Sequence, residues 1–441
     1  MFQQLSLFEN SEQDSNESQR FRQNIKGFGF NYQEIDIGDI TFKAGQIESI
    51  HRWYRLTPSY SPNLVRFFIK QFAIDRKSLV LDPFSGRGTT IIECQKHGIL
   101  SLGLEINPLL QRVSQDSLIW KLENLPLINS FLKDASELIE EYQKQSIDYV
   151  AHCLNTKIPI IHNVFRWWKP HVLKELIIFR FLINKPKYSK IFSYLWLAVN
   201  KASLDCANIH RNHPTITFDD NHTRNINVFE DIKNNLIMIQ SDLKKLSSQE
   251  LCYSQLNHVS LGNSTSNLQK HIFQKVNFVI TSPPYPNRYS YVHQTRPQLY
   301  FMELLKDVKQ ATEIDLKAIG GTWGRATSIL QKNLISPPDD LKPYLDYYSE
   351  LSQKSILMCN YATKYFIDMQ KHIRSLKEVT SSNFRGAYVV GNSRLSGVEV
   401  FTEVILARMF EKEGFEVDKI ITFRKRGGKK KLYETAICIR D

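Results

Sequence analysis

The tetrapeptide Ser282-Pro283-Pro284-Tyr285 has the side chains needed for chemistry on the amine of an aromatic base, and it directly follows an apolar run that ends at Thr281. The serine hydroxyl and the Pro283 carbonyl can accept hydrogen bonds from an amine, and the tyrosine ring can stack on a base. Two prolines fix φ and keep the loop rigid before a substrate binds. A proline turn after a buried strand has the same pattern, so a function needs support from a second motif.

That second motif runs from Ser78 to Thr90, about 200 residues upstream. It predicts a buried strand, a glycine turn and the start of a helix. Gly86 and Gly88 allow the backbone to turn tightly and to approach a ligand closely, and Asp82 can bind an ammonium group. No Gly-Lys-Ser/Thr follows, which excludes a phosphate-binding P-loop. Ile91 stands where a dinucleotide fingerprint requires a third glycine.

A second short strand, Ser101 to Glu105, is expected about fifteen residues further on. It ends in a carboxylate, and Glu105 is placed to accept hydrogen bonds from two ribose hydroxyls. Each of these elements alone is common in α/β proteins. Their order along the chain favours a nucleoside-containing cofactor, bound where the strands end.

Together these motifs resemble those of S-adenosylmethionine-dependent DNA methyltransferases that act on exocyclic amines, and the Ser-Pro-Pro-Tyr form is similar to the cytosine-N4 branch. The resemblance covers about half of the chain. It implies an α/β fold with a class I methyltransferase-like Rossmann sheet, mostly parallel with a C-terminal antiparallel hairpin, and with a mostly helical insertion. The implied methyl donor is S-adenosylmethionine, without a metal.

The resemblance also assigns roles to individual residues. Asn263 stands where the family usually has an aspartate beside the adenine ring, and Thr57 begins a segment, followed by a helix near 63–72, that closes over the methionine end. The implied catalytic residues are Ser282, Pro283, Pro284 and Tyr285. The implied cofactor-binding residues are Asp82, Pro83, Phe84, Gly86, Gly88, Thr89, Glu105, Asn263, Thr281 and Thr57.

The expected reaction is direct methyl transfer to an amine of a base flipped out of the duplex, because the amine cannot meet the methyl group inside the base stack. The chain has no Pro-Cys dipeptide, the nucleophile site of cytosine-C5 methyltransferases, so a covalent intermediate is not expected. Here the cofactor motif precedes the catalytic motif. The reaction requires the 82–90 turn and the 282–285 loop to be neighbours at one edge of a sheet.

The predicted domains are a disordered tail, 1–24, a catalytic domain formed by 25–112 and 257–441, and a helical insertion, 113–256. Apolar spacing predicts helices over 130–145, 171–182 and 191–202 of the insertion. Its polar segment from His210 to Arg224 is a candidate for target recognition, since its donors can reach base edges. The stretch 286–345 competes for that role.

The C-terminal region predicts a strand over 386–392, a helix over 400–412, and a hairpin of 417–426 and 429–440 around Gly427-Gly428. Lysines and arginines crowd the turn: Lys425, Arg426, Lys429, Lys430 and Lys431. A solvated hairpin tip and a contact with DNA phosphates explain this charge equally well.

Composition agrees with a nucleic-acid enzyme of the bacterial cytoplasm, associated with the nucleoid. The 57 lysines and arginines exceed the 45 acidic residues, and the net charge of +12 attracts a polyanion such as double-stranded DNA. No apolar stretch is long enough to span a membrane. Six cysteines without metal-type spacing fit a reducing compartment, and His210 with His213 is too few ligands for a metal site. In the polar tail, Gln4-Leu5-Ser6-Leu7-Phe8 resembles the peptide by which bacterial enzymes bind the sliding clamp.

Several alternatives remain open. The adenine-N6 branch usually carries Asp at the position of Ser282, but the boundary between the branches is not strict. An RNA guanine-N2 methyltransferase has a similar cofactor loop, with Asp before its prolines and a separate RNA-binding module. A catalytically silent nucleic-acid-binding protein of the same fold is the third alternative. A cognate restriction endonuclease is a further expected partner.

Overall fold

The computed structural model describes residues 28–41, 45–56, 59–210, 216–221, 224–247, 257–266, 268–321, 324–426 and 432–441. The predicted tail with its clamp-binding pentapeptide, Thr57, and the hairpin turn at 427–431 lie outside these ranges. The chain divides into two compact units. Unit 1 comprises Met1–Gly38, Thr265–Tyr289 and Thr327–Asp441, and unit 2 comprises Asp39–Ser264 and Ser290–Ala326.

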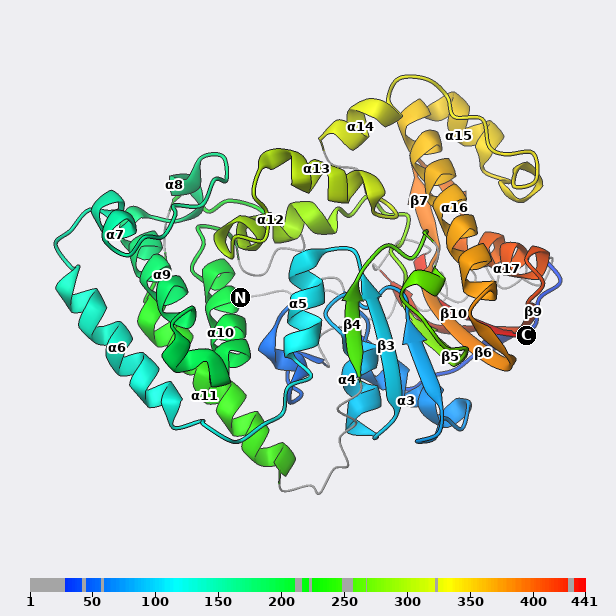
Figure 1. The fold of residues 1–441 in the computed structure, drawn as a ribbon. Coiled ribbons are helices and arrows are strands. Elements are labelled where there is room, and N and C mark those ends of the chain that lie inside the picture. The colour runs from blue at the N-terminus through cyan, green and yellow to red at the C-terminus, as the bar shows by residue number, and fades with distance from the viewer. Residues whose placement is uncertain are drawn as a thin grey trace, which may run out of the picture. The chain divides into compact units, whose positions relative to one another are not determined.

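Unit 2 contains a parallel sheet of β2 (Leu79–Asp82), β3 (Leu100–Glu105) and β4 (His258–Leu261), with β3 in the centre (Figure 1). Every residue of β2 is buried, as expected of a parallel strand whose two faces are both covered. In register, Asp82 lies opposite Gly103, and Glu105 lies opposite Leu261. The predicted strands at 78–82 and 101–105 are therefore confirmed, and their acidic last residues lie at the same edge.

Two helices of unit 2 frame the glycine turn. The expected amphipathic helix is α3 (Pro62–Gln71). Ser61 caps its N-terminus, and the Ser61 hydroxyl accepts a hydrogen bond from the Asn63 amide at 3.2 Å. The turn itself leads directly into α4 (Thr89–Lys96). The further helices of unit 2 are η1 (His51–Trp53), α5 (Pro108–Asp116), α6 (Leu127–Glu141), α7 (Ile147–Cys153), α8 (Val164–Trp167), α9 (Pro170–Ile183), η2 (Pro186–Ile191), α10 (Phe192–Asp205), α11 (Val228–Ser247), α12 (Tyr291–Phe301) and α13 (Val308–Lys317).

Helices α6, α9 and α10 confirm the three predicted for the insertion. They share one hydrophobic core with α4 and α5 before the insertion and with α12 after it. Contacts also join the insertion to the chain after Ser290: the Ile216 amide donates to Gln294 Oε1 at 2.9 Å, and the Arg296 guanidinium lies 5.3 Å from the centre of the Trp167 ring. The described parts of 113–256 and 290–326 thus form one body. Their assignment to target recognition stays a prediction.

Unit 1 contains the second group of strands: β1 (Tyr32–Glu34), β5 (Val276–Thr281), β6 (Thr380–Gly391), β9 (Glu416–Arg426) and β10 (Leu432–Arg440). β5 pairs with β6 and β1 with β9 in parallel, whereas β10 is antiparallel to both of its neighbours, β6 and β9. The expected α/β fold, a methyltransferase-like mostly parallel sheet with an antiparallel C-terminal hairpin, is confirmed.

Helix α17 (Thr402–Lys412) packs on β6, β9 and β10 and corresponds to the helix predicted at 400–412. The remaining elements of unit 1 are η3 (Leu268–Lys270), η4 (Lys342–Tyr344), α15 (Tyr348–Lys354), α16 (Ile356–Lys377), β7 (Ser393–Leu395) and β8 (Val398–Val400), and the chain passes between the units within α14 (Arg325–Leu330). Within the described residues, no helix combines the length and the apolar character needed to cross a membrane.

Candidate active site

The glycine turn of unit 2 is a compact backbone structure at the end of β2. The Ser85 amide donates to the Leu104 carbonyl at 3.0 Å, and the Gly88 amide donates to the Ser85 carbonyl at 2.7 Å. Gly86 and Gly88 have φ of +52° and +89°, where a side chain is disfavoured. Gly88 is the residue directly before α4, so its conformation sets the direction of that helix. The prediction of a tight turn that needs both glycines is confirmed.

Asp82 lies under this turn with its side chain buried. Its Oδ1 accepts a hydrogen bond from the Phe84 amide at 3.1 Å, and its carbonyl accepts one from the Ser85 hydroxyl at 3.1 Å. Next in the chain, Pro83 is buried and Phe84 is half-buried, while Thr89 is buried as the first residue of α4. These contacts fix a carboxylate at the base of the turn, where it can face a cationic group.

Glu105 connects the glycine turn to the neighbouring strand. Its Oε2 accepts from the Gly86 amide and its Oε1 from the Asn107 amide, both at 2.8 Å. Burial raises the pKa of Glu105 to about 7, with a further rise from the charge of Asp82, although the two amides favour the ionised form. Each oxygen keeps a lone pair, so the carboxylate can still accept hydrogen bonds from a diol.

Asn263 lies just beyond β4 at this same edge. The Gly262 amide donates to the Glu105 carbonyl at 2.9 Å, which places Asn263 next to the end of β3. The Asn263 side chain donates from Nδ2 to the Lys317 carbonyl at 3.3 Å. The structure thus gathers Asp82, Glu105 and Asn263 along the carboxyl edge of the β2–β3–β4 sheet. Thr57, the remaining candidate before β2, lies outside the described residues.

A buried arginine, Arg87, was not identified as functional from the sequence. Its Nη1 donates to the carbonyls of His51 and Tyr54, the latter at 3.2 Å, and burial lowers its pKa to about 10. Arg87 therefore joins the glycine turn to the segment around η1. Its position between Gly86 and Gly88 was the only sequence signal for this role.

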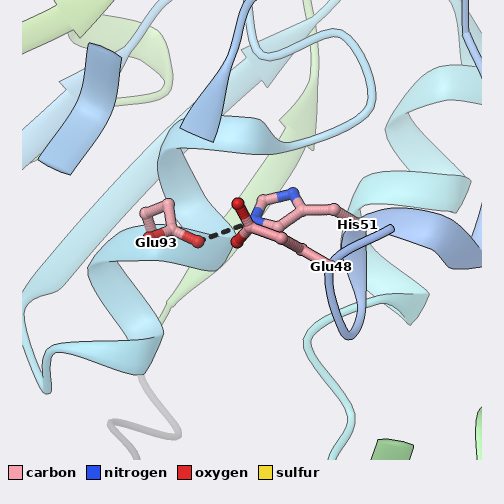
Figure 2. Close-up of side chains that lie close together, drawn as sticks. All are labelled: Glu48, His51 and Glu93. Atoms are coloured by element: carbon pink, nitrogen blue, oxygen red, sulfur yellow. Dashed lines mark hydrogen bonds and ion pairs between the residues drawn. The ribbon is translucent and has the colours of Figure 1, made fainter. Parts of the chain in front are cut away.

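Near this arginine lies a cluster that has the composition of a metal site: Glu48, His51 and Glu93, whose ligand-type atoms all lie within 4.8 Å of one another (Figure 2). His51 Nε2 lies 2.6 Å from Glu93 Oε1. Burial, followed by the charge of Lys96, lowers the pKa of His51 to about 4, so its neutral ring donates to Glu93.

The carboxylates of this cluster are already neutralised by cations. Arg66 Nη1 donates to Glu48 Oε2 at 2.9 Å and to Glu93 Oε2 at 3.0 Å, and Lys96 Nζ donates to Glu93 Oε1 at 2.8 Å. A divalent cation would have to displace these groups. The cluster is therefore an ion-pair network that joins the segment before η1 to α3 and α4, and its residues do not fit a metal.

The loop Ser282–Tyr285, the candidate catalytic loop, belongs to unit 1. Thr281 is the buried last residue of β5 and lies opposite Tyr388 of β6. Pro283 is buried, whereas Ser282, Pro284 and Tyr285 are half-buried. The Ser282 hydroxyl donates to Tyr285 Oη at 3.4 Å, and the turn closes through a 2.7 Å hydrogen bond from the Asn287 amide to the Tyr285 carbonyl. The predicted loop directly after a buried strand is confirmed as a structure.

Two residues of the β9–β10 hairpin, Glu434 and Arg426, contact Tyr285, and a third, Arg424, holds Glu434. Tyr285 Oη donates to Glu434 Oε1 at 3.5 Å, and Arg424 Nε donates to Glu434 Oε2 at 2.6 Å. The Arg426 guanidinium carbon lies 4.9 Å from the centre of the Tyr285 ring. Burial, and then the charge of Glu434, raise the pKa of Tyr285 above its usual range, so its hydroxyl stays protonated.

Comparison with known proteins supplies the class that this fold and these motifs suggest. Residues 39–116, which include the glycine turn and Glu105, match a family model described as a DNA methylase. The chain is 23% identical to the Type II methyltransferase M.BsoBI of Geobacillus stearothermophilus, over 88% of this chain and 83% of that protein. It is 24% identical to the Type II methyltransferase M.MvaI of Kocuria varians, over 87% and 86% respectively.

A solved structure, the rRNA methyltransferase aviRa from Streptomyces viridochromogenes, aligns over 90% of this chain and 92% of its own at 9% identity, with a TM-score of 0.31, which is too low to support any conclusion. The family match and the two relatives support an amino-group DNA methyltransferase. The methyltransferase class implies S-adenosylmethionine as the methyl donor.

Proposed function

We propose that the protein transfers a methyl group from S-adenosylmethionine to the exocyclic N4 amine of cytosine in DNA, as the modification enzyme of a restriction-modification system. The observation that carries this proposal is the hydrogen bond that the Ser282 hydroxyl donates. The hydroxyl donates its hydrogen to Tyr285 Oη, so its lone pairs remain available to accept from a target amine. Relatives named as Type II methyltransferases support the modification role.

The residues at the carboxyl edge of β2–β3–β4 fit the cofactor. A Cβ built on Gly86 would meet nothing within 4 Å, so there is open space beside the turn for a ligand. In this proposal Asp82 binds the ammonium of the methionine part, Glu105 accepts from the ribose hydroxyls, and Asn263 contacts the adenine. When bound, S-adenosylmethionine supplies a methyl group on a positively charged sulfur.

The loop after β5 acts on the base. A flipped cytosine stacks on the Tyr285 ring, while the Ser282 hydroxyl and the Pro283 carbonyl accept the two hydrogens of its amine. These bonds orient the nitrogen lone pair toward the methyl carbon. As the nitrogen–carbon bond forms, the sulfur–carbon electron pair stays on sulfur, and the nitrogen releases one proton to water. Orientation in a preorganised polar site accounts for most of the acceleration.

We further propose that the polar segment 210–224 reads the target together with the part of the stretch 286–345 that contains Gln294 and Arg296. The hydrogen bond from Ile216 to Gln294 supports this part of the proposal, because it joins two segments that are distant in sequence. Trp167 also links them, since its ring contacts both Phe218 and Arg296. A variant at either segment should then change the set of methylated sites, whereas variants at the catalytic loop should only change the rate.

The decisive experiment is product analysis. The protein is incubated with labelled S-adenosylmethionine and plasmid DNA, and the DNA is digested to nucleosides. Labelled N4-methyl-2′-deoxycytidine supports the proposal. Labelled N6-methyl-2′-deoxyadenosine would assign the chain to the adenine branch. The absence of label from DNA, with label in an RNA control, would reject a DNA substrate.

Variants then test the residue assignments. Ser282→Ala should lower kcat about 5- to 150-fold, the equivalent of one hydrogen bond of about 1–3 kcal/mol to the amine. Tyr285→Ala and Gly86→Val should abolish activity without unfolding the protein. Ser349→Ala, on the exposed face of α15, is the matched control and should retain full activity. Unchanged turnover of both Ser282→Ala and Tyr285→Ala would contradict the catalytic assignment.

A further inference from the structure

The β9–β10 hairpin contains an irregularity at the level of Tyr285. Glu434 pairs with Arg424, but the next residue, Thr435, pairs with Thr422, so Phe423 is an extra residue on β9. Such a bulge redirects the side chains that follow it. Here it places Arg424, rather than Phe423, opposite Glu434. Because side chains alternate along a strand, Arg426 then lies on the same face as Arg424.

Arg426 is held in one place by the backbone around it. Its Nη2 donates to the Asn392 carbonyl at 2.7 Å and its Nε to the Tyr433 carbonyl at 2.9 Å. The Asn392 side chain in turn accepts from the Tyr433 amide at 2.7 Å, which joins the end of β6 to β10. These two carbonyls hold the guanidinium in place. A lysine at a solvated hairpin tip, in contrast, would move freely.

Gly391 is part of the same arrangement. A Cβ at this position would lie 2.0 Å from Arg426 Nη2 and 2.3 Å from its central carbon, so only glycine leaves room for the guanidinium there. By its place in the sequence, Arg426 is one of the basic residues that crowd the hairpin turn. In the structure it is instead the last residue of β9, half-buried over an aromatic ring.

We propose that Arg426 is the positioning residue for the stacking tyrosine: its fixed guanidinium covers one face of the Tyr285 ring and leaves the opposite face for the flipped base, while Glu434, held by Arg424, fixes the tyrosine hydroxyl. This inference rests on the function proposed above. It assigns to the C-terminal hairpin the task of presenting the base-stacking ring. The ring contact with Arg426 and the hydroxyl contact with Glu434 are two separate arms of this arrangement.

The two arms can be tested separately by double-mutant cycles on kcat/KM for DNA. Arg426→Ala should lower kcat/KM about tenfold, the scale of a desolvated cation–π contact, and should lower it equally in a Tyr285→Phe background, where the ring remains. Glu434→Gln should lower kcat/KM in the wild type but have no effect in Tyr285→Phe, since the hydroxyl is already absent. Affinity for S-adenosylmethionine should be unchanged in all variants. A full effect of Glu434→Gln in the Tyr285→Phe background would overturn the hydroxyl arm.

The alternative role for Arg426 is a contact with a DNA phosphate. Arg426→Lys separates the two, because lysine keeps the charge but cannot present a flat face while donating to two carbonyls. The positioning role predicts that Arg426→Lys is as impaired as Arg426→Ala, with a normal salt dependence of DNA binding. A phosphate contact predicts near wild-type activity of Arg426→Lys. It also predicts that, in Arg426→Ala, the slope of log DNA affinity against log salt concentration is lower in magnitude by about one. Either result overturns the inference. Arg385→Ala, an exposed arginine of β6, controls for loss of one charge.

These outcomes are distinct from a failure of the proposed function. If wild-type protein transfers no methyl group to DNA, the function itself is rejected. If the wild type is active but Arg426→Ala is indistinguishable from it, the function stands and only the positioning role is rejected. Thermal unfolding of each variant provides the structural control. Affinity for the cofactor provides a second one, because a variant that has lost its fold also loses this affinity.

Discussion

The amide of Gly86 donates to Glu105 Oε2 at 2.8 Å, which joins the glycine turn after β2 to the last residue of β3. A second amide, that of Asn107, donates to the other oxygen of the same carboxylate at 2.8 Å. Glu105 therefore shapes the turn before any ligand is present. Because it is also the proposed acceptor for the ribose hydroxyls, its ionisation should affect both the turn and the binding of the cofactor.

Cofactor binding should depend on pH through Glu105. Burial raises the pKa of this group to about 7, so near pH 6 most of the carboxyl is protonated and carries a hydrogen where it should accept one. Affinity for S-adenosylmethionine is expected to increase about tenfold from pH 6 to pH 8 and then to level off. Calorimetric titration at four pH values measures this. Glu105→Gln should bind weakly at every pH, and a wild-type affinity that is flat over this range would contradict the assignment.

The two glycines of the turn should differ in what they tolerate. A Cβ on Gly88 would lie 2.3 Å from Ser114 Oγ and 3.1 Å from Ser114 Cβ, whereas a Cβ on Gly86 meets nothing within 4 Å. Gly88→Ala should therefore lower the free energy of unfolding by about 2–4 kcal/mol, through positive φ together with a clash against α5. Gly86→Ala should cost only about 1 kcal/mol but should weaken cofactor binding.

Ser114 provides the control for this comparison. Ser114→Ala removes the oxygen nearest to the added Cβ, so the double variant Gly88→Ala with Ser114→Ala should recover part of the lost stability. Urea midpoints of the single and double variants measure the recovery. Equal midpoints for Gly86→Ala and Gly88→Ala would show that the approach of α5 is not what requires the second glycine.

The positions of Asp82 and Glu105 could be predicted because parallel strands end at one edge of a sheet, so an acidic residue at the end of each apolar run is placed by topology alone. The rigid loop after β5 followed from its two prolines in the same way. Helices α9 and α10 could also be predicted, since their apolar content leaves little choice of structure. For each of these, local sequence was sufficient.

The neighbours of Tyr285 could not be predicted. Glu434 lies opposite Arg424 only because Phe423 is bulged, and the register of a hairpin is not determined by the composition of its strands. A glutamate within the otherwise apolar run of β10 was the available signal. The Glu48–His51–Glu93 network depends on the packing of η1 against α4, which brings together residues about 40 positions apart in the sequence.

The Glu48–His51–Glu93 cluster should not respond to metals. Arg66 and Lys96 already neutralise its carboxylates, at 2.8–3.0 Å. Neither EDTA nor equimolar Zn²⁺ is expected to shift the melting temperature, whereas Arg66→Ala should lower the free energy of unfolding by about 1–3 kcal/mol, because the buried Glu93 loses a charged partner. Differential scanning calorimetry tests both statements. A zinc-dependent rise in melting temperature that is lost in His51→Ala would establish a metal site there instead.

The stability of unit 1 should decrease with rising pH because of Glu403, a fully buried residue of α17. Neither of its carboxylate oxygens has a hydrogen-bond partner in another described residue, and burial raises its pKa to about 7. The folded protein therefore binds a proton at Glu403 between the usual carboxyl pKa and pH 7, where the unfolded chain does not. The stabilisation is complete at low pH and is lost as the pH rises through 7.

Glu403→Gln removes this titration, so the difference in stability between the variant and the wild type should depend on pH. The variant is expected to gain stability relative to wild type between pH 5 and pH 8, by on the order of 3 kcal/mol. Urea unfolding at both pH values, followed by a probe in unit 1, measures the difference. Glu411→Gln, an exposed position on the same helix, is the matched control and should show no pH-dependent difference. A difference between Glu403→Gln and wild type that is the same at both pH values would mean that Glu403 does not titrate between them.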